Sequence, residues 1–387
     1  MADGAGIAAA SVLGAAVSHA DTARAAADDL AAGLAGQDPC FVLVFARDDL
    51  DLDAFGPALA AAFDGVPVFG CTSAGQITPA GYETGATLAV AFPRAHFRCA
   101  SQLIAPLTPL DIGALADAAA RLDAQFQRQA RGRRLALMLA DGLSLQEEML
   151  AATLTAALGD VPVFGGSAGD ALAFRRTRIL HGGRFHGDGA VLLLLETDLD
   201  VAGLGFDHFR PTGRKIVVTG AVPEKRLVTE LNGAPAAAEY ARLVGCGPDE
   251  LSPEIFAENP ILARNNALYH VRAIRAVTED GALSFMSAID DGLILTLGQG
   301  TGILATLQEG LDLRDRMGRP PAAILGFDCI LRRLEIEAKG LAGAASDVLR
   351  RARVLGFNTY GEQHLGVHVN QTFVGVAFFH PDPPVLS

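Results

Sequence analysis

Hydrophobic residues of this chain gather in short uninterrupted runs that alternate with amphipathic stretches. Phe41 to Phe45 is such a run, and a helical stretch from Asp53 to Phe63 follows it. Leu135 to Leu139 is likewise followed by a helical stretch from Gln146 to Leu158. Apolar runs of four to eight residues bounded by glycine or proline are typical of buried strands. Strands that alternate with helices favour parallel pairing with helices covering the sheet, so the pattern predicts an α/β fold.

A repeated motif joins these segments into units. The segment 66–75 (VPVFGCTSAG) recurs as 161–169 (VPVFGGSAG), 95 residues later and with one residue deleted. A further buried strand is expected after each copy, at 85–92 and 189–195. Each unit is therefore predicted to run strand, helix, strand, glycine-rich loop, strand, in mixed sheets.

A less similar repeat of this unit, which we call the echo, ends the chain. It comprises a strand at 322–327, one helix from about 331 to 353, the segment 356–362 (GFNTYGE) and a last strand at 372–379. The echo predicts that the C-terminal part contains a third, diverged copy of the same arrangement.

The region between the second copy and the echo has a different pattern. Strands are expected at 215–219 and 226–231, and a helix at 235–244 follows the Asn232-Gly233 turn signal. An antiparallel meander with a hairpin turn at Glu279-Asp280-Gly281 is predicted next. Its strands are 270–278, 282–289 and 293–297. Residues 206–213 read as a loop, so we predict two domains, 1–207 and 208–387.

Composition narrows the function classes. Of 387 residues, half are hydrophobic and only 19% are charged, which is typical of a well-buried globular chain. The net charge of −13 argues against nucleic acid as a partner, because nucleic-acid binding relies on basic surfaces.

Cysteine usage and hydropathy bear on location. The five cysteines are odd in number and form no CxxC pair, which argues against a disulfide framework or structural zinc. The apolar stretch from Gly4 to Val17 has no basic residue before it, unlike a signal peptide. No run approaches the ~20 apolar residues of a membrane span. We therefore expect a cytoplasmic protein without membrane contact.

The glycine-rich loops are the first candidate binding elements. Loops at the carboxyl ends of strands line the crevice where α/β sheets bind ligands, and their backbone N–H groups can hold anions or carboxylates. The alternative is that the glycines only permit tight turns. The candidate residues are Gly70, Cys71, Thr72, Ser73, Gly75, Gly165, Gly166, Ser167 and Gly169.

Two further features suggest chemistry. Gly165 to Gly169 spells G-x-S-x-G, the nucleophile elbow of α/β-hydrolases, with Ser167 as the nucleophile. That elbow needs a helix directly after it, whereas 171–180 alternates like a strand, so a hydrolase is the weaker alternative. Arg332, at the start of the C-terminal helix, is either a solvated residue or part of a charged wall facing a polar ligand.

At this point the chain resembles FIST-domain proteins. Each matching motif is short, but their shared order is specific and extends over residues 40–380. The motifs are Gly70 to Gly75, Gly165 to Asp170, Asn232 to Ala236, Gly356 to Glu362 and His368 to Thr372. One departure is Gln76, where the family usually carries glutamate.

The resemblance implies an N-terminal FIST domain followed by a FIST C-terminal domain. It also implies a sensory protein, not an enzyme, that binds a small molecule such as an amino acid and acts on a signalling partner. Tyr360, Gly361, Glu362 and Asn370, which lie in the matching motifs, are then further ligand-binding candidates.

Gly326 to Glu335 resembles the NosP subgroup, which are haem-binding nitric-oxide sensors that regulate histidine kinases in trans. A single histidine suffices to hold b-type haem. Because domain interfaces are natural ligand pockets, His208, beside the predicted boundary, is the candidate iron ligand. The resemblance therefore favours a haem-based nitric-oxide sensor, with an amino-acid or other small-molecule sensor without haem as the alternative.

Overall fold

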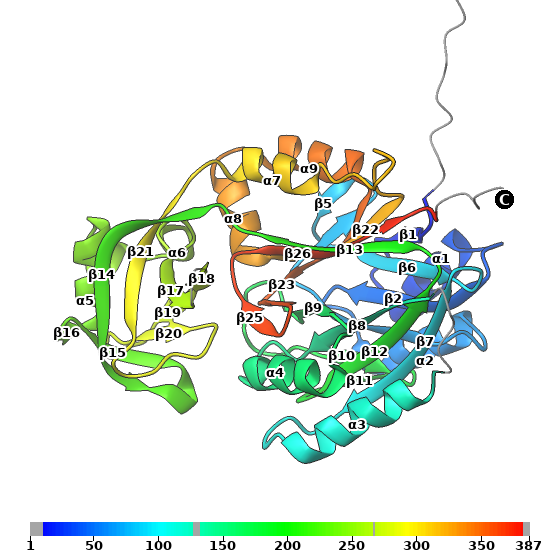
Figure 1. Cartoon of the computed structure of the whole chain (residues 1–387), viewed down its shortest axis with the longest axis horizontal. Coiled ribbons are helices and arrows are strands. Elements are labelled where there is room, and N and C mark those ends of the chain that lie inside the picture. The colour runs from blue at the N-terminus through cyan, green and yellow to red at the C-terminus, as the bar shows by residue number, and fades with distance from the viewer. Residues whose placement is uncertain (1–10, 127–131, 266–267, 382–387) are drawn as a thin grey trace, which may run out of the picture.

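Three related α/β units and one inserted β-rich lobe make up the protein. The computed structural model describes residues 11–126, 132–265 and 268–381, so part of the apolar N-terminal stretch lies outside the described residues (Figure 1). The first unit contains β1 (Gly14–Ser18), α1 (Ala23–Gly33), β2 (Pro39–Ala46), α2 (Leu52–Ala62), β3 (Val68–Thr72), β4 (Gln76–Thr78), β5 (Gly81–Glu83) and β6 (Thr87–Pro93).

The second unit repeats this order, and the third does so with two helices in place of the second one. The second contains β7 (Phe97–Ile104), α3 (Ile112–Ala124), β8 (Arg133–Ala140), α4 (Glu147–Leu158), β9 (Val163–Ser167), β10 (Ile179–His181), β11 (Arg184–His186) and β12 (Ala190–Thr197). The third contains β13 (Asp200–Phe206), α7 (Ile303–Leu311), β22 (Ala323–Cys329), α8 (Ile330–Ala338), α9 (Ala342–Arg351), β23 (Val354–Thr359), β24 (Glu362–His364), β25 (Val367–Val369) and β26 (Phe373–Phe379).

Each unit builds a mixed sheet of the same design. Its two central strands are parallel (β2 with β3, β8 with β9, β22 with β23), and its last strand pairs antiparallel beside them. The short hairpin that follows each second parallel strand joins another unit's sheet. β4–β5 extends β23, β10–β11 extends β3, and β24–β25 extends β9. The predicted mixed α/β architecture and its repeat are confirmed, and the echo is a third copy.

A glycine at the same place in each unit shows how closely the copies correspond. Gly70, Gly165 and Gly356 each face their paired residue on the neighbouring parallel strand. A Cβ added at any of the three would lie 1.8 Å from that residue's carbonyl oxygen. No side chain fits at that distance, so all three copies require glycine in the middle of a strand.

The inner faces of the three sheets meet in one core, and the helices cover the outside. Aromatic rings from different sheets pack at its centre, with Phe45 stacked on Phe357 at 4.5 Å and Phe97 against Phe378 at 5.5 Å. Separate apolar clusters join each sheet to its own helices. None of the helices in the described part of the chain is long and apolar enough to cross a bilayer.

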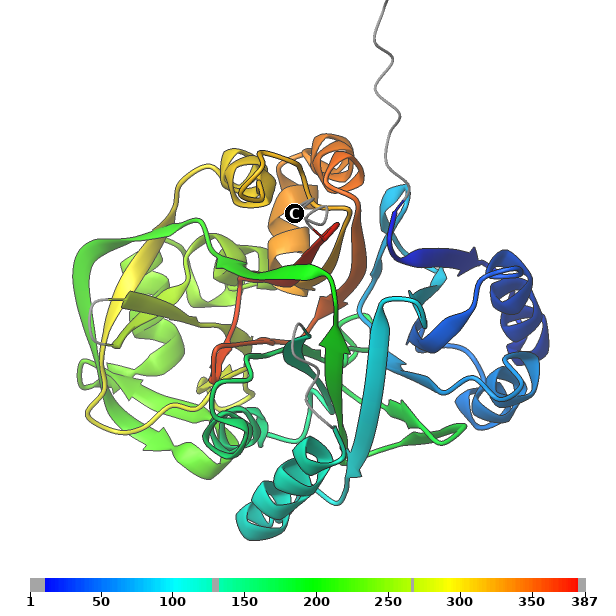
Figure 2. The same ribbon diagram turned by 45° about the vertical axis from the view of Figure 1, so that its right-hand side comes forward.

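The lobe is inserted between β13 and α7 and lies at one end of the molecule (Figures 1 and 2). It has its own core around Ile216, Tyr240 and Phe285. Its elements are β14 (Phe209–Val222), β15 (Leu227–Leu231), β16 (Ala234–Pro235), α5 (Ala236–Val244), α6 (Pro253–Glu258), β17 (Ile261–Asn265), β18 (Leu268–Arg272), β19 (Ile274–Val277), β20 (Leu283–Phe285) and β21 (Ile294–Gly300), with short 3-10 turns at 223–225 and 248–250.

Four local predictions are corrected. The predicted helix 331–353 is two helices, because Gly340 adopts a positive φ of 68° between them. Most of 171–180 is a loop, since the Asp170 carboxylate accepts hydrogen bonds from three backbone N–H groups within it. The predicted loop 206–213 already contains the start of β14. In the meander the β19–β20 hairpin is confirmed, but β21 pairs with β14 and β17 instead of β20.

Candidate functional site

The loops that follow β3, β9 and β23 meet where the three sheets converge, and backbone hydrogen bonds join them. Each loop donates one backbone hydrogen bond to the strand end of the next unit, so that three equivalent bonds of 3.1 Å close a ring. The bonds run from Gly169 to Thr72, from Tyr360 to Ser167 and from Ala74 to Asn358. These three N–H groups are therefore used between loops instead of by an anion, and the bonds fix the strand ends relative to each other.

Side chains of these loops are also engaged with protein. Gly75 is so close to the Arg333 guanidinium that an added Cβ would lie 2.2 Å from Nη1. Gln76 is buried and donates from Nε2 to the Ser73 hydroxyl at 2.7 Å, a role that the family's glutamate could fill only when protonated. Gly70, Cys71 and Gly166 are enclosed within the strands, and burial raises the pKa of the Cys71 thiol well above its usual range.

Ser167 lacks the surroundings of a nucleophile. Its side chain is fully buried, and its hydroxyl accepts a hydrogen bond from the Gln363 amide at 3.0 Å. An amide is no general base, and the segment after Ser167 is a loop instead of the helix that a nucleophile elbow requires. This geometry gives the hydrolase alternative no support.

Glu362 is a carboxyl group held in the protein interior. It is fully buried, contacts the Thr359 hydroxyl, and accepts from the Thr372 hydroxyl at 2.6 Å. Burial raises the pKa of Glu362 to about 8, and the nearby Asp328 carboxyl acts in the same direction. Glu362 is therefore neutral at pH 7 and serves as a hydrogen-bonding group that joins β24 to the end of β23 and to the residue before β26.

Arg332 and His208 belong to one buried network where the lobe leaves the third unit. Arg332 Nε donates to Asp328 at 2.8 Å, and its Nη1 lies 3.3 Å from His208 Nδ1. The other ring nitrogen, Nε2, lies 2.9 and 3.0 Å from the two Glu335 carboxylate oxygens. Because an arginine can only donate, Nδ1 accepts and Nε2 carries the proton. Burial lowers the pKa of His208, which agrees with a neutral ring.

A second polar cluster lies where the lobe rests against α4. Arg226, 3% exposed, reaches from the lobe to two carboxylates in the first turn of that helix, Glu147 at 2.7 Å and Glu148 at 2.5 Å. Glu148 also accepts from the Ala288 backbone N–H at 2.6 Å. Arg226 also donates to the Met286 carbonyl oxygen. Burying the charges of this triad is offset by these contacts, which the lobe and α4 make only when they lie together, so the triad fixes where the lobe meets the second unit.

Arg272 lies in the same region, but unlike Arg226 it has no hydrogen-bonding or ionic partner in the described part of the chain. It is only partly exposed, yet its guanidinium has no hydrogen bond or ion pair with any described residue, and Nε and Nη1 are both shielded from solvent. The preceding residue, Val271, forms a β-bridge to Asn370, which brings the β18 strand against the C-terminal motif. Burial lowers the pKa of Arg272, and Glu148 partly opposes this effect.

His368 and Asn370 complete what we call the interface cluster, defined as Glu148, Arg226, Arg272, His368 and Asn370. His368 is 1% exposed, and its Nε2 has no hydrogen-bond partner among the described residues. Burial lowers the pKa of His368, so the ring is neutral at pH 7. The cluster therefore combines a cation without a partner, a neutral imidazole and a carboxylate, at a seam between two bodies of the protein.

Family comparisons fit this architecture. The FIST N domain profile matches residues 40–234, and the FIST C domain profile matches residues 236–364. This chain belongs to the FIST family. No curated protein matches it. The FIST N match covers half of the chain and ends inside the inserted lobe, between β15 and α5. FIST domains are sensory modules of signalling proteins, so this chain is a sensory or signalling protein.

The FIST motifs divide between two places in the structure. Tyr360 and Gly361 join the loop ring to the interface cluster, because a Cβ at Gly361 would lie 2.3 Å from the His368 ring and 2.9 Å from the Asn370 amide. Tyr360 donates to Asp170 through its hydroxyl, which in turn accepts from Leu172 N at 2.7 Å. The predicted Arg332 lies elsewhere, in the His208 network.

Haem does not fit at His208. An iron ligand needs one free imidazole nitrogen beside an open face, and both nitrogens of His208 are used by Glu335 and Arg332 in a fully buried side chain. Among the described residues no group of three or more His, Cys, Asp or Glu side chains is placed to hold a metal ion.

Sequence reasoning missed Arg272, His368, Arg226 and Glu148 as site residues. Arg272 lies in a predicted strand with no motif around it. What marks it as a site residue is that its guanidinium lacks a hydrogen-bond partner among the described residues, and the sequence cannot show this. Only His368 offered a signal, because it opens one of the FIST motifs, His368 to Thr372.

Proposed function

We propose that this FIST protein senses a small ligand that carries a carboxylate, such as an amino acid, bound at the interface cluster. The observation that supports the proposal is Arg272, whose two shielded nitrogens have no partner among the described residues. Leaving buried donors unpaired costs about 1–3 kcal/mol each. A bound carboxylate would accept from one edge of this planar group, through Nε and Nη2 or through Nη1 and Nη2, and would so give one of the two shielded nitrogens a partner.

The neighbours of Arg272 suit the remainder of an amino acid. The Glu148 carboxylate can face a ligand ammonium group, while the neutral His368 ring and the Asn370 amide can donate or accept. Because the Glu148 carboxylate lies close to Arg272, a ligand with an ammonium group beside its carboxylate is favoured over a phosphate, which Glu148 would repel. Of the predicted residues, Asn370 belongs to this site, and Tyr360 and Gly361 adjoin it.

Binding at this place would couple to the position of the lobe. Arg226 and Arg272 come from the lobe, whereas Glu148 and His368 come from the three-unit body. A ligand that contacts both bodies stabilises the arrangement in which they are closest, and its differential affinity sets how far the equilibrium moves. We propose that a histidine kinase in trans reads this change.

The nitric-oxide-sensing function is the competing proposal, and nothing at His208 favours it. Haem would have to use a different histidine. When bound it would supply an iron centre for nitric oxide, and the absorption spectrum would report it directly. A sharp Soret band that saturates near one equivalent of added haem would replace the amino-acid proposal.

The decisive experiment is isothermal titration of the purified protein with single amino acids and matched carboxylic acids. Replacing Arg272→Gln should weaken binding about 10- to 100-fold, because hydrogen bonds to charged groups contribute about 1.5–3 kcal/mol. Arg242→Gln is the control, since Arg242 is an exposed lobe arginine paired with Glu239. Equal affinity in both variants would reject Arg272 as the anchor. Kinase autophosphorylation with and without the ligand then tests the output.

A further inference from the structure

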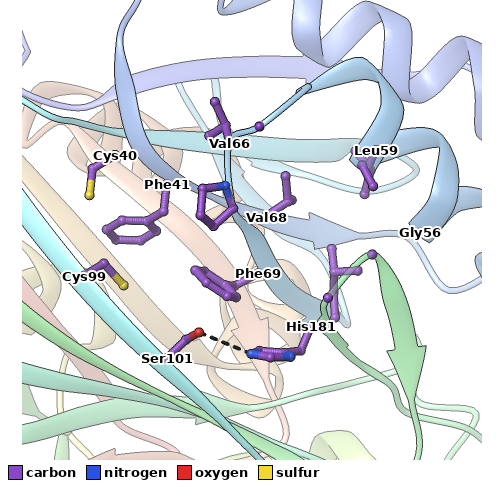
Figure 3. Close-up of a pocket in the computed structure, with 16 residues that line it drawn as sticks. Cys40, Phe41, Gly56, Leu59, Val66, Val68, Phe69, Cys99, Ser101 and His181 are labelled. Carbon is purple, nitrogen blue, oxygen red and sulfur yellow. Dashed lines mark hydrogen bonds between the residues drawn. The ribbon is translucent and has the colours of Figure 1, made fainter. Parts of the chain in front are cut away.

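An apolar pocket lies at the opposite side of the fold, between the first and second units. It has a volume of about 450 Å³ and is formed by α2, the beginnings of β2 and β3, β7, and the β10–β11 turn (Figure 3). Phe41, Phe69, Leu59 and Val68 are among the apolar residues that line it. Pockets of this size lined by apolar side chains with a few polar groups are typical of small-molecule sites.

Polar groups gather at one side of this pocket. His181 Nε2 lies 3.2 Å from the Ser101 hydroxyl, and Figure 3 shows both side chains below the Phe69 ring. The other ring nitrogen, Nδ1, has no hydrogen bond with a described residue. Burial and the nearby His186 lower the pKa of His181. A neutral imidazole with one available nitrogen offers a ligand one hydrogen bond and no charge.

The matching seam between the second and third units shows that this pocket is not a necessary result of the fold. There Phe164 and His364 occupy the places of Phe69 and His181, and the two ring pairs have similar centroid distances, 5.9 and 5.6 Å. A Cβ at Gly203 on β13 would lie 2.3 Å from the Phe164 ring, so the strand packs directly onto it.

The first seam carries Ser101 on β7 where the second carries Gly203, as the strand pairings of β7 with β12 and of β13 with β26 indicate. The strand therefore stands off from the ring pair, and the space between them stays open. The far wall is fixed by a close contact, because a Cβ at Gly56 would lie 2.5 Å from the Gly183 carbonyl oxygen. The third seam, between the third and first units, also has a pocket at the matching place, of about 330 Å³ and lined by Ala15, Pro79 and Leu355. None of the described histidines lines that pocket, so His181 at a polar end distinguishes the pocket of the first seam.

We infer that this pocket is a second ligand site, for a compact uncharged aromatic molecule of indole or phenol size with one hydrogen-bonding group. The ring would lie among Phe41, Phe69 and Val68, and its polar group would reach His181. This site is remote from Arg272 and takes a different chemical class, so it does not depend on the function proposed above.

Indole is the probe of choice, because the chain contains no tryptophan and indole emission can be read without protein background. We expect saturable binding with a blue shift of the emission. Ala60→Phe, at the exposed pocket rim, should abolish it, whereas Ala61→Phe, one residue further along α2 and not part of the lining, should leave it unchanged. His181→Gln should weaken binding up to about tenfold, the value of one hydrogen bond.

Two results would overturn the inference. One is that neither indole nor phenol binds the wild-type protein saturably. The other is that Ala60→Phe binds indole as tightly as Ala61→Phe does. Arg272→Gln should not alter indole binding, so this test and that of the carboxylate site succeed or fail separately. Circular dichroism of each variant verifies that its overall secondary structure is retained.

Discussion

Glu362 makes the stability of the protein depend on pH in a direction opposite to that of most carboxyl groups. In the folded protein its pKa is about 8, against 4.5 for an ordinary glutamate. Between those values the folded chain keeps a proton that the unfolded chain releases, so the free energy of unfolding falls as pH rises. The slope is about 1.4 kcal/mol per pH unit, and the total is on the order of 5 kcal/mol.

Replacing Glu362→Gln removes this dependence. The amide can donate to Thr359 and accept from Thr372, so the contacts survive while the group stays neutral at every pH. At pH 5 the variant and the wild type should unfold at nearly the same temperature. At pH 8.5 to 9 the variant should be more stable by several kcal/mol, on the order of the cost of ionising Glu362 inside the protein.

Thermal unfolding of both proteins from pH 5 to 9, at constant ionic strength, measures the difference. Glu230→Gln, at an exposed lobe position, is the control and should show no pH-dependent difference from wild type. If the gap between Glu362→Gln and wild type were the same at pH 5 and pH 9, Glu362 would be ionised in the folded state. Its assignment as a neutral group would then be wrong.

Other predictions address the lobe interface and the strand glycines. Arg272→Met should raise the unfolding temperature of the ligand-free protein, since two shielded N–H groups no longer lack partners. Arg226→Met should instead lower stability by about 3–5 kcal/mol, measured by urea unfolding, because it leaves buried Glu147 unpaired. Gly165→Ala should lower it by more than ~4 kcal/mol, given a carbonyl oxygen 1.8 Å from the new Cβ. Gly343→Ala, in an open helical position, should raise stability by about 0.5–1 kcal/mol in the same assay.

Local pattern was enough to find the repeated unit. The VPVFG segments read as strands because their apolar residues are flanked by glycine and proline, and both form strands at equivalent places, β3 and β9. The pairing of the strands could not be predicted from local pattern. The β4 strand is three residues long and pairs with β23, and β21 pairs with β14 and β17, because partner choice depends on contacts between distant segments.

The same contrast holds for the site residues: those within local motifs were predicted, and those defined by contacts between distant segments were not. Tyr360, Gly361 and Asn370 were found because they lie in FIST motifs. Asn370 belongs to the interface cluster, and the other two lie beside it. Arg272 was missed because its distinguishing property is the absence of a partner, which only the folded arrangement reveals. His208 was chosen from its place near a boundary, and the structure shows that Glu335 and Arg332 take both of its nitrogens.

The exchange of hairpins among the three sheets has a consequence for synthesis on the ribosome. Ile77 of the first unit pairs with Gly356 of the third, so the edge that β4–β5 must join is made far later than the hairpin itself. At about 5–20 residues per second, the interval is roughly 14 to 56 s. Until then the nascent chain carries a hairpin with an unpaired edge, and a chain truncated after the FIST N match would carry it permanently. Such a fragment should aggregate or recruit chaperones, whereas the complete chain closes all three sheets together.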